Sequence, residues 1–123
     1  MPPIEPIGVV RTTIETSSDA PMQGLEEDFE GELVFEEDCL DGLDGLEAGM
    51  TIDVLWYAHE ADRSVLKVRD GERGVFSTRS PARPNPICVS PCKIIAIDPP
   101  RVRVRGIDMV DGSPLLDVKA ALR

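Results

Sequence analysis

The chain has 123 residues and a mass of 13.4 kDa, which suits one ordinary domain, so a single unit over residues 1–123 is expected. Hydrophobic residues make up 41% and charged residues 29%, which excludes a wholly disordered chain or a coiled coil. The net charge of −10 divides unevenly: residues 1–50 hold 14 acidic side chains against one basic, a balance of −13, and residues 51–123 hold 12 basic against nine acidic, a balance of +3. An anionic partner is therefore expected at the second part, although an acidic surface can equally serve solubility or salt adaptation.

Compartment and metal binding follow from what the chain lacks. No apolar run reaches the roughly 20 residues that cross a bilayer, and no basic segment precedes an apolar one at the N-terminus, so a cytoplasmic protein without membrane association is expected. Cys39, Cys88 and Cys92 are an odd number, which favours reduced thiols. With His59 they number four zinc-type ligands, but Cys88 and Cys92 lack the C-x-x-C spacing, and no metal site is expected.

Seven short segments rich in Val and Ile, separated by Gly, Pro or Asp, predict strands. In chain order they cover residues 4–11, 31–35, 51–57, 64–68, 89–97, 102–107 and 115–118. Because closing the sheet removes the exposed edges of so many short strands, the pattern predicts a mainly β fold, a small single-domain barrel that is closed or partly open.

One segment has helical spacing. Apolar residues recur from Leu40 to Met50 at intervals of three and four, which predicts a helix within 38–50. Gly42 and Gly45 each cost such a helix about 1 kcal/mol relative to alanine, so one or two short turns are expected. The glycines do not follow the G-x-G-x-x-G spacing, which argues against a Rossmann-type nucleotide domain.

The loop 79–86 is the densest candidate for a binding site. Three prolines stiffen it, so Arg79 and Arg83 are expected to be preorganised donors for a carboxylate or a phosphate. Asn85 could read an adenine edge or cap a turn. The alternative is a surface loop whose arginines are solvated or paired with the acidic part of the chain.

The segment 108–119 combines a turn with charged residues. Asp111 and Gly112 predict a tight turn before a strand, whatever else they do. Asp117 and Lys119 are two residues apart in an extended segment and share a face, where they could pair or bracket a polar ligand.

Two further features have an ordinary explanation beside a functional one. Arg101, Arg103 and Arg105 alternate with valines and place three guanidinium groups on one strand face, which could bind RNA phosphates but is more typical of a solvated outer face. His59, the only histidine, follows an apolar run at a predicted strand end, where it is either a site residue or an ordinary hydrogen-bonded one.

Two long blocks, residues 74–87 (GVFSTRSPARPNPI) and 106–119 (GIDMVDGSPLLDVK), resemble the signature blocks of the TsaA-like, or TrmO, family. Residues 7–11 and 21–23 match in the same order, so the resemblance spans nearly the whole chain. It implies a small barrel that binds S-adenosylmethionine outside the Rossmann methyltransferase class, as a homodimer. It also implies methylation of N6 of threonylcarbamoyladenosine next to the anticodon of tRNA.

The resemblance also implies which residues bind the cofactor. Arg79 would hold its carboxylate, the turn at Asp111 would face its sulfonium, and backbone groups near Val89 would meet its adenine. No catalytic residue can be assigned. The full implied cofactor site is Pro21, Met22, Gln23, His59, Glu60, Arg79, Val89, Met109, Val110, Asp111 and Gly112, with Arg83, Asn85, Asp117 and Lys119 as further residues of the same blocks.

Three departures from the family pattern bear on function. Met22 stands where members usually have arginine, and Cys88 replaces the usual glycine after the PNPI run. The C-terminal domain of fuller-length members is expected to be absent. The leading hypothesis is a tRNA methyltransferase; the alternatives are a non-catalytic module that binds S-adenosylmethionine and regulates, and a methyltransferase for a small molecule.

Overall fold

The computed structural model describes residues 1–13 and 29–122. Its fold is mainly β, as the spacing of the Val- and Ile-rich segments predicts. The strands are β1 (Gly8–Arg11), β2 (Glu30–Phe35), β3 (Thr51–Tyr57), β4 (Lys67–Val68), β5 (Arg73–Gly74), β6 (Ile87–Asp98), β7 (Arg101–Arg105) and β8 (Pro114–Ala120). Two short 3-10 turns, η2 (Glu37–Leu43) and η3 (Val75–Ser77), complete the described elements.

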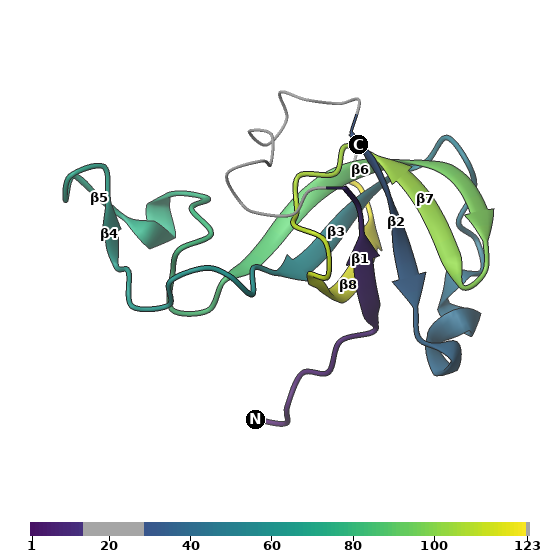
Figure 1. Ribbon diagram of the computed structural model, residues 1–123, viewed down its shortest axis with the longest axis horizontal. Coiled ribbons are helices and arrows are strands. Elements are labelled where there is room, and N and C mark those ends of the chain that lie inside the picture. The colour runs from purple at the N-terminus through teal and green to yellow at the C-terminus, as the bar shows by residue number, and fades with distance from the viewer. Residues whose placement is uncertain (14–28, 123) are drawn as a thin grey trace.

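Six strands form a closed antiparallel barrel in the order β1–β2–β7–β6–β3–β8, with β8 returning to β1 (Figure 1). Closure depends on the long strand β6. Its first part pairs with β3 from Ile87 to Lys93, and its second part pairs with β7 from Lys93 to Asp98. Pro91 lies in the first part, where β6 does not pair with β7, so its missing N–H costs no bond to that strand.

The barrel interior is aliphatic, which fits a chain with 4% aromatic residues. Alternating residues of each strand point inward, and Val10, Leu33, Ile52 and Val104 are fully buried. Trp56, the single tryptophan, closes one end of this core and is 7% exposed. The barrel is therefore a packed core, and its ligand sites lie at the ends and in the connections.

One predicted element is confirmed and one is much shorter than expected. The one or two short helical turns expected within 38–50 are the 3-10 turn η2, which ends at Leu43; Gly45 and Gly49 after it both adopt a φ of 95°, which no helix contains. The strand expected over 64–68 is reduced to Lys67–Val68, which pairs only with Arg73–Gly74 in a separate two-stranded sheet.

The strand boundaries elsewhere agree to varying degrees. β3 spans 51–57 as predicted, because its alternating apolar residues coincide with pairing on both sides. The first strand begins at Gly8 rather than at residue 4, since residues 1–6 are exposed and join no sheet. β6 and β8 extend beyond their predicted limits because each has a paired neighbour along the added residues.

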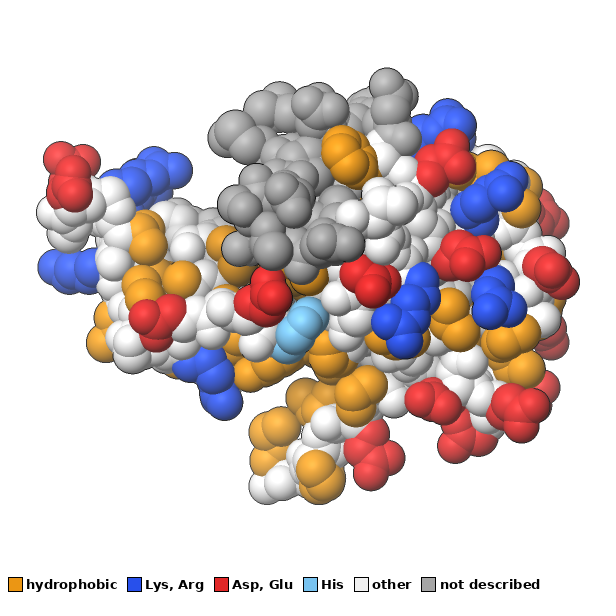
Figure 2. Space-filling model, viewed as in Figure 1, with side chains coloured by type: hydrophobic (Ala, Val, Ile, Leu, Met, Phe, Trp, Pro, Cys, Tyr) orange, Lys and Arg blue, Asp and Glu red, His pale blue; other side chains and the backbone are white. Residues whose placement is uncertain are grey.

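Residues 58–86 leave the barrel between β3 and β6 as one long excursion. It contains β4, β5 and η3, and it extends to the left of the barrel in Figure 1. Residues 63–83 hold six basic and two acidic side chains, whereas residues 36–47, around η2, hold six acidic and no basic ones. In Figure 2 acidic side chains gather at the lower right, the end that carries η2, and the β4–β5 hairpin at the left carries basic side chains with Asp70 and Glu72 among them.

The arginine stripe of β7 lies on the outer face of the barrel and is neutralised there. Arg101 approaches Glu32 at 3.5 Å, and Arg103 and Arg105 approach Glu30 at 4.0 and 3.2 Å, across the β2–β7 pairing. These exposed pairs contribute little stability, but they lower the positive potential of the strand. The ordinary explanation, an outer strand face, is confirmed.

Among the described residues, no helix has the length and apolar character needed to cross a membrane.

Candidate functional site

A cleft of about 1100 Å³ lies where the excursion 58–86 meets the end of the barrel. Its lining includes residues 58–62, Arg69 and the loop 78–83 from the excursion. From the barrel it includes the ends of β3 and β6 and the connection between β7 and β8. The register of β3 against β8 shifts between Leu55 and Trp56, and an irregularity of this kind redirects side chains at a strand end toward a neighbouring site.

The predicted site residues fall into three groups. Those that line the cleft are His59, Glu60, Arg79, Arg83, Val89 and Val110. Those that the structure describes but does not place on its lining are Asn85, Met109, Asp111, Gly112, Asp117 and Lys119. Pro21, Met22 and Gln23 lie outside the described residues.

Arg79 has the properties expected of a ligand-binding guanidinium. It is exposed on the cleft wall and makes no ion pair or side-chain hydrogen bond with the rest of the described chain. Arg69, which sequence reasoning missed, lines the same cleft and likewise makes no ion pair or side-chain hydrogen bond with the described chain. It has a φ of 57° in a turn with Asp70 and Gly71. Two guanidinium groups that have no partner among the described residues therefore line one cleft, in contrast to the paired arginines of β7.

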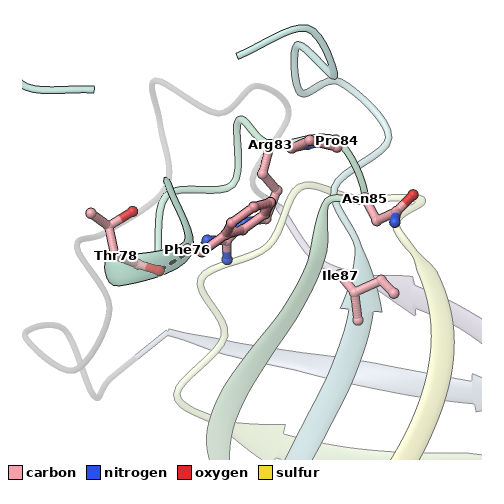
Figure 3. A pocket seen from close by; sticks show the side chains of 6 residues that line it. All are labelled: Phe76, Thr78, Arg83, Pro84, Asn85 and Ile87. Carbon is pink, nitrogen blue, oxygen red and sulfur yellow. Dashed lines mark hydrogen bonds between the residues drawn. The ribbon is translucent and has the colours of Figure 1, made fainter. Parts of the chain in front are cut away.

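Arg83 binds the protein itself. Its Nη2 donates to the carbonyl oxygens of Val75 and Thr78, the second at 3.0 Å, and so ties the proline-rich loop back to η3. Figure 3 shows the Arg83 side chain extending from the loop toward the turn that carries Phe76 and Thr78. Its Nε is buried and has no hydrogen-bond partner in the described part of the chain. The structure therefore gives Arg83 the role of fixing the loop on which Arg79 stands.

Asn85 is also used internally. Arg63 donates from Nε to the carbonyl of Pro84 at 2.8 Å and from Nη2 to Oδ1 of Asn85 at 3.2 Å. These bonds join the two ends of the excursion. Asn85 lines a smaller hollow of about 310 Å³, together with the exposed Phe76 and Ile87 (Figure 3).

The turn at Asp111 and Gly112 is a tight turn, as predicted. Gly112 has a φ of 85°, and Ser113 donates its N–H to the carbonyl of Val110. The Asp111 carboxylate accepts the N–H of Thr12 at 3.0 Å and approaches Arg11 at 3.6 Å, so it fixes the end of β1. The neighbouring Met109 is fully buried in the core.

Asp117 and Lys119 pair with each other. Their charged groups are 3.6 Å apart on the outer face of β8, and both side chains are at least half exposed. Of the two alternatives open from the sequence, pairing is the one that the structure shows. Their strand neighbours across β3 are Leu55 and Asp53.

A buried hydrogen-bond chain at the cleft is the main feature that sequence reasoning missed. Trp56 donates its Nε1–H to Ser90 Oγ at 2.9 Å, and Ser90 donates its hydroxyl to Asp108 Oδ1 at 2.6 Å. Trp56 and Asp108 both line the cleft. Burial raises the pKa of the Asp108 carboxyl, and the bond from Ser90 opposes that rise by stabilising the charged form. Position 108 lay inside a signature block, but nothing in the sequence connected it to Ser90.

The residue that departs from the family glycine, Cys88, lies in the same cleft. Burial is the largest cause that raises the pKa of its thiol to about 11; the charge of Asp108 adds to this, and Arg83 opposes it. Burial likewise raises the pKa of Cys92 to about 12. Both thiols are therefore neutral at ordinary pH.

We expect iodoacetamide at pH 8 to alkylate Cys88 in the folded protein about 100-fold more slowly than in protein unfolded in guanidinium. The thiolate is the reactive form, and a pKa of about 11 against the ordinary 9.0 lowers its population by that factor. The rate should rise tenfold per pH unit up to about 11. Mass spectrometry of the tryptic peptides measures it, and equal rates in folded and unfolded protein would contradict the burial of this thiol.

His59 is exposed at the mouth of the cleft and follows β3 by two residues. Within the ranges that the structure describes, no three His, Cys, Asp or Glu side chains gather as a metal site.

Comparisons with known proteins agree with this fold. Residues 9–123 match the model of the tRNA-methyltransferase O N-terminal domain. Two archaeal relatives are named probable S-adenosyl-L-methionine-binding proteins. The one from Halobacterium salinarum is 50% identical, over 95% of this chain and 96% of its own length, and the one from Methanothermobacter thermautotrophicus is 46% identical, over 94% and 87%.

A solved structure of TrmO superposes with a TM-score of 0.85 and 32% sequence identity. The match covers 99% of this chain but only 58% of that protein. The resemblance of the two signature blocks and the non-Rossmann barrel are thereby confirmed, and the chain belongs to the family of the tRNA-methyltransferase O N-terminal domain.

Proposed function

We propose that this protein is an S-adenosylmethionine-dependent methyltransferase that methylates N6 of threonylcarbamoyladenosine next to the anticodon of tRNA. The observation that carries the proposal is the cleft whose lining includes the Asp108 carboxylate and two arginines, Arg79 and Arg69, that pair with no side chain of the described residues. Its relatives' names support binding of S-adenosylmethionine.

The residues of the cleft fit that molecule. Its amino-acid carboxylate calls for a guanidinium that is not already paired, and Arg79 has no such partner in the ranges 1–13 and 29–122. Its adenosine and methylene groups call for apolar surface, which Trp56, Ala58 and Val110 supply. The cleft, at about 1100 Å³, is slightly larger than the usual range for small-molecule sites, roughly 300–1,000 Å³. When bound, S-adenosylmethionine supplies a methyl group on a sulfonium, and the protein has to align the acceptor with it.

The net charge of the whole chain is negative, but the excursion 58–86 carries the positive charge that binding to RNA phosphates requires. Three of the six basic side chains of residues 63–83 line the cleft, Arg69, Arg79 and Arg83, and the acidic η2 segment lies at the far end of the barrel. Phosphates are expected to approach from the side of the β4–β5 hairpin.

We also propose a homodimer. Leu66 and Phe76 are 60% and 81% exposed on the excursion, next to the cleft residues Arg69 and Thr78. Apolar side chains of this size at a site are expected to be covered by a partner surface. Sedimentation equilibrium tests this, and a monomer at micromolar concentration would contradict it.

We expect Arg79→Ala to weaken the binding of S-adenosylmethionine by about 10- to 150-fold, the loss of a charge-assisted hydrogen bond worth about 1.5–3 kcal/mol. Titration calorimetry measures it against a wild-type Kd expected in the micromolar range, about 8 kcal/mol. Arg103→Ala is the matched control, because Arg103 is on the outer barrel face and should bind as wild type does. Wild-type affinity in the Arg79 variant would refute this site.

The transfer itself is tested with methyl-labelled S-adenosylmethionine and tRNA that carries threonylcarbamoyladenosine without the methyl group. Label recovered in that nucleoside supports the proposal. Binding without transfer would favour the non-catalytic module, and label in a small molecule without tRNA would favour the third hypothesis.

A further inference from the structure

The methyl acceptor has a proton to lose, and the cleft has few groups that can take it. A nitrogen that keeps its N–H proton while it gains a methyl group becomes a cation, so a positioned base lowers the barrier. Three carboxylates and one histidine line the described part of the cleft: Glu60, Asp62, Asp108 and His59.

Three of these four groups are exposed at the mouth. Glu60 and His59 are exposed on the wall formed by residues 58–62. Asp62 accepts both the hydroxyl and the N–H of Ser64, at 2.6 and 2.8 Å, and these bonds hold the pKa of Asp62 below its usual value. Asp62 is therefore a weaker base than an ordinary carboxylate.

Asp108 differs from them in position and support. It is half-buried and lines the cleft from the connection between β7 and β8, whereas Arg79 lines it from the loop 78–83. The chain from Trp56 through Ser90 fixes its Oδ1, and Trp56 and Ser90 are 7% and 1% exposed. A carboxylate held by buried partners keeps one orientation, which proton transfer in a defined geometry requires.

We propose that Asp108 is the base that accepts the proton of the methyl acceptor, oriented by Ser90 and Trp56. This inference rests on the proposed function and adds the residue that sequence reasoning could not assign. The acceptor nitrogen forms its bond to the methyl carbon as the carbon–sulfur bond breaks. The electron pair of the broken bond stays on sulfur, the sulfonium becomes a neutral thioether, and the N–H proton passes to the Asp108 carboxylate.

The surroundings of Asp108 suit this role. The charge of Asp108 raises the pKa of two thiols of β6, Cys88 and Cys92. Both thiols are neutral at ordinary pH, so neither competes for the proton. The charge of Arg83 opposes the rise in the pKa of Cys88. Burial places the pKa of Asp108 above the ordinary 3.8, which makes it a stronger base than an exposed aspartate.

The test is Asp108→Asn, which keeps the size of the side chain and removes the base. We expect kcat for methylation of the tRNA to fall by about 10²- to 10⁴-fold. The Kd values of S-adenosylmethionine and of S-adenosylhomocysteine should both stay within about threefold of wild type, since the base contacts the acceptor. Asp98→Asn, at the exposed far end of β6, is the matched control and should keep wild-type kcat.

The two affinities separate the proposal from a role in binding the sulfonium. A carboxylate that faces the sulfonium favours S-adenosylmethionine over its neutral product. Loss of affinity for S-adenosylmethionine alone in Asp108→Asn would therefore overturn the proposal, as would a kcat within threefold of wild type. A wild-type protein that binds S-adenosylmethionine but methylates no tRNA would refute the proposed function, and the base with it.

A pH profile gives a second readout that a merely structural role would not move. The base accepts a proton only when it is ionised, so kcat should rise as the pH rises through the pKa of Asp108. The acid limb of the plot of kcat against pH should therefore have its midpoint above 3.8. Ser90→Ala removes a bond that favours the ionised form, and the limb should move to higher pH. An unmoved limb in folded Ser90→Ala would count against Asp108. Asp108→Glu should restore part of kcat if Asn impairs folding.

Discussion

Gly8→Ala is expected to lower the melting temperature by about 12 °C. Gly8 is in β1 and pairs with Phe35 on one side and Leu115 on the other, at the seam that closes the barrel. A Cβ on Gly8 would collide with the backbone carbonyl of Val34, which belongs to a paired strand and cannot move aside as a side chain can. Overpacking of this kind costs about 3 kcal/mol, and each kcal/mol corresponds to about 4 °C in a domain of this size.

Gly42→Ala is the matched control for that experiment. A Cβ at Gly42 meets no atom within 4 Å, and the residue has no left-handed φ. The melting temperature of this variant should equal or slightly exceed that of wild type, because alanine restricts the unfolded chain. Differential scanning calorimetry of both proteins decides: a Gly8→Ala variant that melts within 3 °C of wild type would contradict the closed pairing of β1.

The sequence predicts those parts of the fold that neighbouring residues determine, and it misses those that depend on backbone angles or on contacts between distant segments. β3 was predicted with both ends correct, because its alternating Ile, Val and Trp are sufficient to define one buried face. The short turns expected within 38–50 are present as η2, but the leucine spacing does not show where they end, because it says nothing about the left-handed φ of Gly45 and Gly49. The barrel itself followed from the number of short strands, but its strand order did not.

The candidate site shows the same limit. Arg79, His59 and Glu60 stand in segments whose sequence already indicated a site, and the structure places all three on the cleft. The sequence does not mark Asp108 as a site residue, because its support, Ser90, is 18 positions away on β6 while Asp108 lies in the connection between β7 and β8. From the sequence, Arg83 is expected to bind a ligand as Arg79 does, because residue spacing does not say where a side chain points. Its hydrogen bonds to the carbonyls of Val75 and Thr78 show that it turns inward.

The inward course of Arg83 leads to a prediction about the loop rather than the ligand. Arg83→Ala removes a charged donor from two backbone carbonyls, one of which, on Val75, also accepts the N–H and hydroxyl of Thr78. Charge-assisted bonds of this kind contribute about 2 kcal/mol. We expect amides in residues 75–83 to exchange hydrogen about 30-fold faster, while the strands of the barrel, which Arg83 does not hold, keep wild-type rates.

The same variant should bind S-adenosylmethionine at least tenfold more weakly, because Arg79 would no longer be held in one place and binding would have to order the loop. Arg83→Lys keeps the charge with a single donor group and should restore part of the protection and part of the affinity. Exchange measured by mass spectrometry distinguishes this from direct contact with the ligand. If Arg83→Ala lost affinity while the amides of 75–83 stayed protected, Arg83 would be a ligand-binding residue after all, and the loop would owe its rigidity to its prolines.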